Sequence, residues 1–174
     1  MFRRFILAAL LLLFCYPPLN AQSEWQQYTF ASAIHSLAEE GDYLWLATYN
    51  RLVKFDKRTY TKEIFTRVNS GLPSVSLSAV MVDHNGVKWV ASSRGLVRFD
   101  GTTWQTFDKA TTSLSLSGIR TLFVDHDNTL WVSTWSELVH YNNDTWTSRL
   151  LLRGTFTSLE TIYEPQENNI MLGR

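Results

Sequence analysis

The sequence predicts an all-β fold, a β-propeller segment of about three and a half four-stranded antiparallel blades that form an incomplete ring. The first observation is a repeat: the pattern of residues 83–104 returns at 125–146, and a looser copy precedes both. The second is its period, because Trp45, Trp89 and Trp131 recur in the three copies at spacings of 44 and 42 residues. A period of 40–45 residues with several short strands in each unit is typical of propeller blades.

The first repeat, about residues 32–66, predicts four strands separated by turns. The strands are expected at 32–38, 43–48, 52–56 and 60–65. Gly41 lies between the first two and supplies the backbone freedom that a tight turn needs. Apolar residues fall on both faces of the second strand, which fits a blade covered on both sides.

The later repeats follow the same plan. The second, about 77–107, is the most regular, with strands expected at 78–82, 88–92, 96–100 and 104–107. Asn85-Gly86 and Asp100-Gly101 are hairpin signals between its strands. The third repeat spans about 119–149, and the fourth, 157–174, reaches only its second strand, with Met171 in the place of the tryptophan.

The first 21 residues predict a signal peptide. Arg3 and Arg4 precede an apolar run at 5–16, which is too short to span a bilayer comfortably. Ala21 is a small residue at a suitable cleavage point. We therefore divide the chain into a signal peptide at 1–21 and a partial propeller at 22–174, located in the periplasm or on the extracellular side of a bacterial envelope.

The two ends of the predicted propeller do not match. Residues 25–30 resemble the last strand of a repeat, whereas the fourth unit stops within its second strand. We therefore expect the chain to be a fragment of a longer propeller, either an open arc or a strained closure with a gap beside Met171. Its unpaired sheet edges are expected to favour aggregation when the chain is expressed alone.

Composition excludes several functional classes. The one cysteine, Cys15, lies in the signal peptide, so the mature chain has no disulfide and no thiol chemistry. Loss of Arg3 and Arg4 lowers the basic count from 16 to 14 against 16 acidic residues, and no basic stripe suits nucleic acid. After the signal peptide, no apolar run of membrane length follows. The four histidines lack metal-ligand spacing, so we expect no metal and no cofactor.

The pattern Asp-x-x-Gly-x-x-Trp-Val-x-Ser-x-x-Gly-Leu-x-x-Phe-Asp at 83–100 resembles the two-component regulator propeller repeat. The link Asn-Ser-Gly-Leu-Pro-Ser-x-Ser that begins at Asn69 resembles the one that this family places between blades. The first and third copies depart from the pattern, since Arg51 and Glu137 replace the glycine before the leucine. Members form the extracytoplasmic sensing part of bacterial hybrid histidine kinases and related regulators, and many respond to glycans. The resemblance thus implies a ligand-sensing role.

Candidate ligand-binding residues lie in the turns between the second and third strands of each repeat. They are Tyr49, Arg51, Arg94 and Trp135. Large aromatic residues are unusual in short turns, which prefer Gly, Asn or Asp, and exposed aromatics beside Arg are common at binding surfaces. The alternative is that these side chains cover the neighbouring blade.

Other repeated residues are interpreted as structural. Trp45, Trp89 and Trp131 are expected in the core between blades. The outer aromatics are expected to pack at the blade rim, with sugar platforms as the alternative; they are Tyr60, Trp104 and Trp146. The pairs Asp83-His84 and Asp125-His126 look like acid–base dyads, but an aspartate at a strand end can instead bind turn amides.

The sequence therefore predicts an exported, non-catalytic ligand-sensing or ligand-binding propeller module. Its partner is expected to be a glycan, another small ligand or another protein, and not nucleic acid. Two alternatives are a periplasmic or surface protein-interaction scaffold and a fragment of a polysaccharide-acting propeller enzyme.

Overall fold

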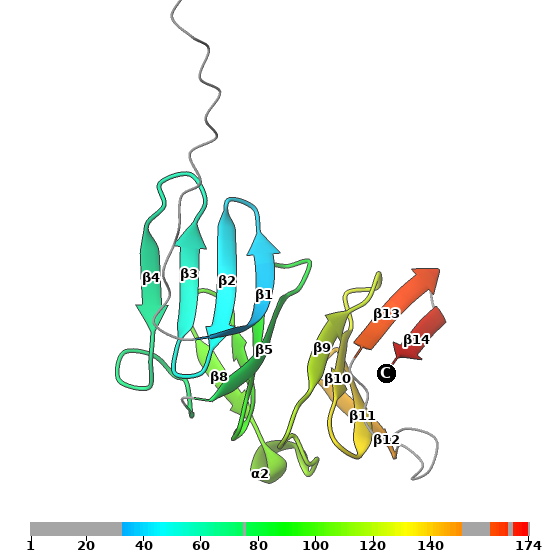
Figure 1. The fold of residues 1–174 in the computed structure, drawn as a ribbon. Helices are drawn as coiled ribbons and strands as arrows, with labels where there is room; N and C mark the ends of the chain where they lie inside the picture. The colour runs from blue at the N-terminus through cyan, green and yellow to red at the C-terminus, as the bar shows by residue number, and fades with distance from the viewer. Residues whose placement is uncertain (1–32, 75, 151–160, 167–168, 174) are drawn as a thin grey trace, which may run out of the picture.

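The computed structural model describes residues 33–74, 76–150, 161–166 and 169–173. The expected signal peptide, the strand at 25–30 and part of the fourth repeat lie outside these residues. Within them, no helix is long and apolar enough to cross a membrane. Nearly every element is a strand, in agreement with the all-β prediction (Figure 1).

Three four-stranded sheets follow one another along the chain, each an antiparallel meander with its strands in chain order. The first sheet contains β1 (Ile34–Glu40), β2 (Tyr43–Thr48), β3 (Leu52–Asp56) and β4 (Lys62–Phe65). The second contains β5 (Leu77–Val82), β6 (Lys88–Ser92), β7 (Gly95–Phe99) and β8 (Trp104–Phe107). The third contains β9 (Thr121–Val124), β10 (Leu130–Ser133), β11 (Glu137–Asn142) and β12 (Thr145–Leu150). A two-stranded sheet of β13 (Thr161–Gln166) and β14 (Asn169–Gly173) comes last.

The sheets are arranged as propeller blades, with their first strands adjacent. β1 contacts β5, β5 contacts β9, and β9 contacts β13. In the described residues the sheets form an open arc and not a closed ring (Figure 1). The predicted propeller segment and its incomplete ring are therefore confirmed.

Turn chemistry explains the repeated aspartates. In the turn after β5, Asp83 Oδ1 accepts hydrogen bonds from the backbone N–H groups of Asn85 and Val87, each at 2.9 Å. Gly86 in that turn has a φ of 75°, a left-handed conformation that glycine adopts without strain. In the corresponding turn after β9, Asn128 takes this conformation. The aspartates thus serve the fold, as the sequence predicts.

The same carboxylate positions also hold the repeated tryptophans. The indole N–H of Trp89 donates to Asp83 at 3.0 Å, and that of Trp131 donates to Asp125 at 2.7 Å. In the first blade, Trp45 donates to Glu40 at 2.7 Å. Because a buried indole N–H needs an acceptor, each blade supplies one from the end of its first strand.

The three tryptophans are buried to different extents, depending on whether another four-stranded blade covers them. Trp45 and Trp89 are 2% and 3% exposed, at the two junctions between blades. Trp131 is only half-buried, in the third sheet, and its ring lies 4.3 Å from that of His140. In the described part of the chain, no further four-stranded sheet follows the third one to cover Trp131.

Aromatic clusters fill both junctions in the same way. Between the first two blades, the rings lie 3.9–6.2 Å apart and belong to Trp45, Phe65, Phe99 and Trp104. Between the second and third blades, the corresponding rings lie 4.4–6.0 Å apart and belong to Trp89, Phe107, Tyr141 and Trp146. The outer tryptophans Trp104 and Trp146 therefore pack between blades.

The link between blades and one outer strand differ from the sequence-based expectation. Tyr60, expected in the fourth strand, has a φ of 61° and lies exposed in the preceding turn, so β4 begins only at Lys62. The link after β8 forms the short helix α2 (Lys109–Thr112). Asp108 caps this helix by accepting hydrogen bonds from two backbone N–H groups.

The turns after the second strands are closed by a repeated hydroxyl three positions after each tryptophan. Thr48, Ser92 and Thr134 donate to the backbone carbonyls of Arg51, Gly95 and Glu137 at 2.9–3.1 Å. Only the second of these acceptors has a positive φ, 129° at Gly95. The first and third copies can therefore place Arg51 and Glu137 where the second requires glycine.

Candidate functional site

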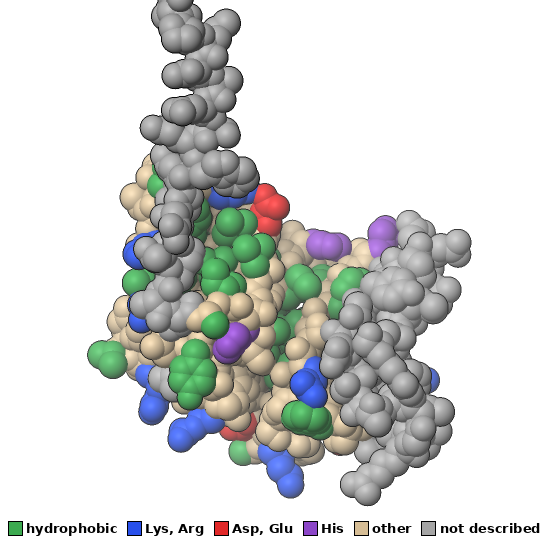
Figure 2. Space-filling model, in the orientation of Figure 1, with side chains coloured by type: hydrophobic (Ala, Val, Ile, Leu, Met, Phe, Trp, Pro, Cys, Tyr) green, Lys and Arg blue, Asp and Glu red, His purple; other side chains and the backbone are tan. Residues whose placement is uncertain are grey.

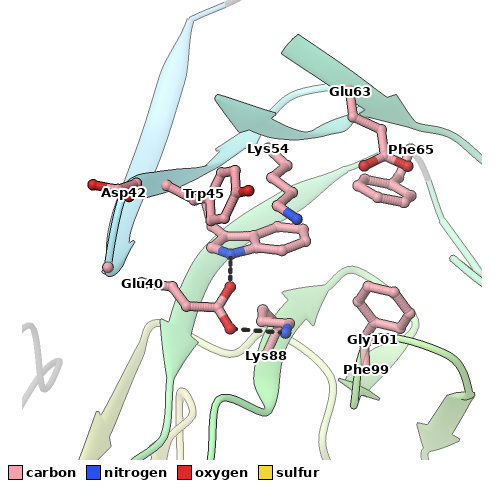
Figure 3. Close-up of a pocket in the computed structure, with 11 residues that line it drawn as sticks. Glu40, Asp42, Trp45, Lys54, Glu63, Phe65, Lys88, Phe99 and Gly101 are labelled. Atoms are coloured by element: carbon pink, nitrogen blue, oxygen red, sulfur yellow. Dashed lines mark hydrogen bonds and ion pairs between the residues drawn. The ribbon is translucent and has the colours of Figure 1, made fainter. Parts of the chain in front are cut away.

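A hollow lies between the first two blades, at the end that carries the β1–β2 and β3–β4 turns (Figure 3). We call it the first inter-blade pocket. Its volume is about 390 Å³. Its lining residues are Glu40, Gly41, Asp42, Tyr43, Trp45, Lys54, Glu63, Phe65, Lys88, Phe99 and Gly101. The size falls in the range of small-molecule sites.

Aromatic rings form one part of the pocket wall. Trp45 from β2 stacks on Phe65 from β4 with ring centroids 5.7 Å apart, and its edge meets Phe99 from β7 at 6.2 Å. The first two residues come from one blade and the third from the next. The wall therefore exists only where two blades meet.

An ion pair with a buried lysine forms a second part of the wall. Lys88 at the start of β6 is 5% exposed, and its ammonium lies 3.2 Å from Glu40 Oε1 and 2.6 Å from the carbonyl of Gly86. It also lies 5.1 Å from the centroid of the Trp45 ring. The other oxygen of Glu40 accepts the indole N–H of Trp45, so Glu40 joins Trp45 to Lys88 across the blade junction (Figure 3).

Two other charged side chains of the pocket, Lys54 and Glu63, are available to bind a ligand. The ammonium of Lys54 lies 4.0 Å from the centroid of the Tyr43 ring and points toward Trp45 (Figure 3). Lys54 on β3 lies opposite Glu63 on β4 in the register of the two strands. Within the described residues, neither side chain has an ion pair or hydrogen bond with another group. Asp42, by contrast, is paired with Arg58 at 3.0 Å.

A similar hollow of about 450 Å³ lies between the second and third blades. Arg98 takes the place of Lys54, Tyr141 that of Phe99, and the apolar Leu130 that of Lys88. The Tyr141 hydroxyl donates to Asp144 at 2.7 Å. Burial, together with this hydrogen bond, raises the pKa of Tyr141 to about 12. The two hollows share a plan but differ in their charged groups.

The four residues predicted to bind ligand lie at the opposite end of the blades. The antiparallel order puts their turns at the end that also carries the links between blades. Tyr49 is 61% exposed, and the Arg51 guanidinium donates to Asn50 at 3.0 Å. Arg94 lines a separate hollow of about 360 Å³. Among the pockets described above, none is lined by more than one of the four.

Trp135 combines exposure with packing on the link that precedes β9. It is 63% exposed, and the guanidinium carbon of Arg120 lies 3.6 Å from its ring centroid. A Cβ atom at Gly118 would lie 2.3 Å from Cδ1 of Trp135, so only glycine leaves room for the ring. Trp135 is therefore partly a packing residue, and it packs on the link and not on the neighbouring blade.

Sequence reasoning missed the charged residues of the first inter-blade pocket. One signal was present: Lys88 is a charged residue at the start of an apolar strand, where the third repeat has Leu130. A lysine in such a strand needs an anionic partner, because burial of an unpaired charge is costly. Its partner Glu40 lies 48 residues earlier, and no pattern within one repeat connects them.

Comparison with known proteins identifies the repeat. Residues 113–136, which include β9 and β10, match the family model described as two component regulator propeller. This chain carries a two component regulator propeller repeat. The resemblance drawn from residues 83–100 is therefore confirmed by an independent match in the next repeat. No curated protein matches the sequence significantly.

Solved structures show the same propeller fold. The extracellular domain described as part of a hybrid two component system of B. thetaiotaomicron superposes with a TM-score of 0.72 at 18% identity. The match covers 85% of this chain and 20% of that domain, so the chain spans about a fifth of it. A computationally designed protein, Ika4, matches with a TM-score of 0.63 at 11% identity, over 85% of this chain and 89% of its own.

One further match is to an enzyme. A virginiamycin B lyase of Staphylococcus aureus superposes with a TM-score of 0.64 at 7% identity. It covers 84% of this chain and 52% of the lyase. At such identities the likeness shows the fold alone. Among the described residues, no group of three or more His, Cys, Asp or Glu side chains is placed to hold a metal ion.

The repeated aspartates predict a pH effect on stability. Burial raises the pKa of Asp125, but hydrogen bonds from Thr129 and Trp131 outweigh it and lower the pKa below 3.8. The carboxylate therefore stabilises the fold at pH above 3.8, and this contribution is lost as the pH falls through the folded-state pKa. Asp125→Asn should cost about 1.5–3 kcal/mol of unfolding free energy at pH 7 and lose less stability on acidification than the wild type.

Urea unfolding between pH 7 and pH 3 measures this effect. Asp127→Asn is the matched control, because Asp127 is exposed in the same turn. A loss at pH 7 for Asp125→Asn that is no larger than that of the control would contradict the structural role of the carboxylate.

Proposed function

We propose that this chain is a non-catalytic ligand-binding propeller module from the sensing part of a two-component regulator, acting outside the cytoplasm. The family match and the likeness to a domain described as extracellular support this proposal. The signal-peptide pattern at 1–21 supports export. Because the chain spans about a fifth of that domain, it supplies part of the sensing surface.

The observation that carries the proposal is the first inter-blade pocket. Its wall offers the rings of Trp45 and Phe65, and two charged groups that make no hydrogen bond to the described residues: the Lys54 ammonium as a donor and the Glu63 carboxylate as an acceptor. A ligand with an apolar face and several hydroxyl groups matches this combination, since orientation in such sites comes from a few polar groups in an aromatic pocket. A glycan unit has this chemistry.

A non-catalytic role is supported by the hydrogen bonds that Asp83 and Asp125 accept. Asp83 accepts two turn N–H groups with one oxygen and the Trp89 indole with the other. Asp125 accepts bonds from Thr129 and from the Trp131 indole. These carboxylates fix a turn and a tryptophan within one blade each, and their repetition in two blades argues for a structural role over a catalytic one.

A second candidate function is a protein-interaction scaffold. It is favoured by large exposed side chains at the end that carries the links between blades: Tyr49, Val68 and Trp135 are 61%, 97% and 63% exposed. Exposed apolar and aromatic side chains of this kind are enriched at protein interfaces. Capture of a protein partner that depends on Tyr49 and Trp135, with no small ligand bound, would favour this alternative.

The proposal is tested by measuring binding of soluble oligosaccharides to the full chain by isothermal titration calorimetry. Lys54→Ala should weaken binding about tenfold, because it removes a hydrogen-bond donor to the ligand. Arg98→Ala is the matched control, because Arg98 takes the place of Lys54 in the hollow between the next two blades. It should leave the affinity within about twofold of the wild type.

Glu63→Gln provides a second test that keeps the shape of the side chain. It should alter the ligand preference without lowering the melting temperature, because Glu63 is exposed. Equal affinities for Lys54→Ala, Glu63→Gln and the wild type would exclude the first inter-blade pocket as the binding site.

A further inference from the structure

The two ends of the blades carry opposite charge. The loops after second and fourth strands, at 49–51, 66–76, 93–94, 108–120 and 134–136, contain five basic residues and one acidic residue. We call this the basic end. In the three four-stranded sheets, the loops after first and third strands contain six acidic and two basic residues. Figure 2 shows Lys and Arg side chains along the lower edge of the molecule, where the β2–β3 turn and α2 lie in Figure 1.

This segregation is hidden in the formal net charge of zero for the whole sequence. The five cations of the basic end are Arg51, Arg67, Arg94, Lys109 and Arg120. Charges gathered on one surface raise the local concentration of oppositely charged ligands. The basic end is therefore the surface that attracts anions, although the chain as a whole is not basic.

A hollow of about 360 Å³ lies within the basic end, between the β6–β7 turn and the link after β8. Arg94 contributes from the turn, and Lys109, Ser115 and Ser117 contribute from the link. We call it the Arg94 hollow. Gly95, next to Arg94, allows β7 and β8 to approach closely beside the hollow. A Cβ atom at this position would lie 2.3 Å from the carbonyl oxygen of Phe107.

Among the described residues, no acidic side chain pairs with the cations of the hollow. Asp108 is its one acidic lining residue, and its Oδ1 accepts hydrogen bonds from the backbone of Ala110 and Thr111 at 2.9 and 3.0 Å. Within the described residues, the side chains of Arg94 and Lys109 form no ion pair and no hydrogen bond. Ser115 and Ser117 add two exposed hydroxyl groups, 3.3 Å apart.

We propose that the Arg94 hollow binds the oxyanion group, a carboxylate or a sulfate, of a soluble ligand. The planar guanidinium of Arg94 can donate two parallel hydrogen bonds to such a group, and Lys109 adds a second positive charge. The two serine hydroxyls can donate to the same oxygens or to a neighbouring hydroxyl. This site goes beyond the proposed function, because it lies at the opposite end of the blades from the first inter-blade pocket.

The experiment measures binding of sulfate, acetate and glucuronate to the full chain by calorimetry at low ionic strength, where screening is weak. Arg94→Ala and Lys109→Ala should each weaken binding about tenfold, because each removes a charge-assisted contact. Arg51→Ala removes the same charge from the same end but outside the hollow, and should weaken binding less than about twofold. The melting temperature of each variant should match that of the wild type, since all three side chains lie at the surface.

The probes also distinguish the source of the anion. Glucuronate that binds more tightly than acetate indicates a ligand in which a sugar ring carries the carboxylate, and equal affinities indicate a site for the anionic group alone. Both results support the site. Equal weakening by Arg51→Ala and Arg94→Ala would overturn it in favour of diffuse charge attraction. Absence of binding to all three soluble anions, or binding only to anionic lipid vesicles, would also overturn it.

Discussion

Trp89→Ala is expected to lower the free energy of unfolding by about 3–5 kcal/mol, the range for loss of a large buried aromatic side chain. Trp89 is 3% exposed, stacks on Phe107 at 6.0 Å and meets Tyr141 of the next blade at 5.2 Å. The substitution opens a cavity at the junction of two blades. It also leaves Asp83 Oδ2 without the indole N–H that it accepts at 3.0 Å.

Trp135→Ala is the control for this prediction. Trp135 is 63% exposed and its main contact is the guanidinium of Arg120, so its removal should cost no more than about 1 kcal/mol. Urea unfolding of the full chain, followed by tryptophan fluorescence and circular dichroism, gives both values. A loss below about 1 kcal/mol for Trp89→Ala would show that the junction between blades is not the stabilising core.

Gly95→Ala is expected to destabilise the chain by at least about 3 kcal/mol, because two costs act together. Gly95 has a φ of 129°, where a side chain is strained. The added Cβ would lie 2.3 Å from the carbonyl oxygen of Phe107, and this backbone atom cannot move without disturbing β8. The expected result is loss of pairing between β7 and β8, with a lower melting temperature and weaker circular dichroism of the sheet.

Gly101→Ala separates the two costs. Gly101 has a φ of 104°, but no atom lies within 4 Å of the position of an added Cβ. This variant should therefore lose only the strain, about 1–2 kcal/mol. Equal losses for the two variants would show that the close approach to Phe107 contributes nothing.

The sequence repeat is sufficient to locate the blades. It predicts Trp45, Trp89 and Trp131 on second strands, and they lie on β2, β6 and β10. It predicts that Asp83 binds turn amides, and Asp83 accepts two of them. These predictions depend on contacts within one repeat, which a period of 40–45 residues makes visible.

The candidate site was less accessible to sequence reasoning. Turn composition pointed to Tyr49, Arg51, Arg94 and Trp135, of which Arg94 lines a described hollow. Trp135 instead packs on Gly118 and Arg120, fifteen or more residues earlier in the chain. Turn composition reports whether a residue suits a turn, and it carries no information about which segment lies against it.

By itself, the sequence determined the fold class, the strand order within each blade and the repeated tryptophans, because each of these follows from contacts inside one unit. Only the tertiary structure decided how neighbouring units differ where they meet. The Glu40–Lys88 ion pair joins residues 48 positions apart, and Phe99 completes the wall begun by Trp45 and Phe65. The two inter-blade hollows arise where the close approach of two sheets places side chains together that no periodic pattern relates.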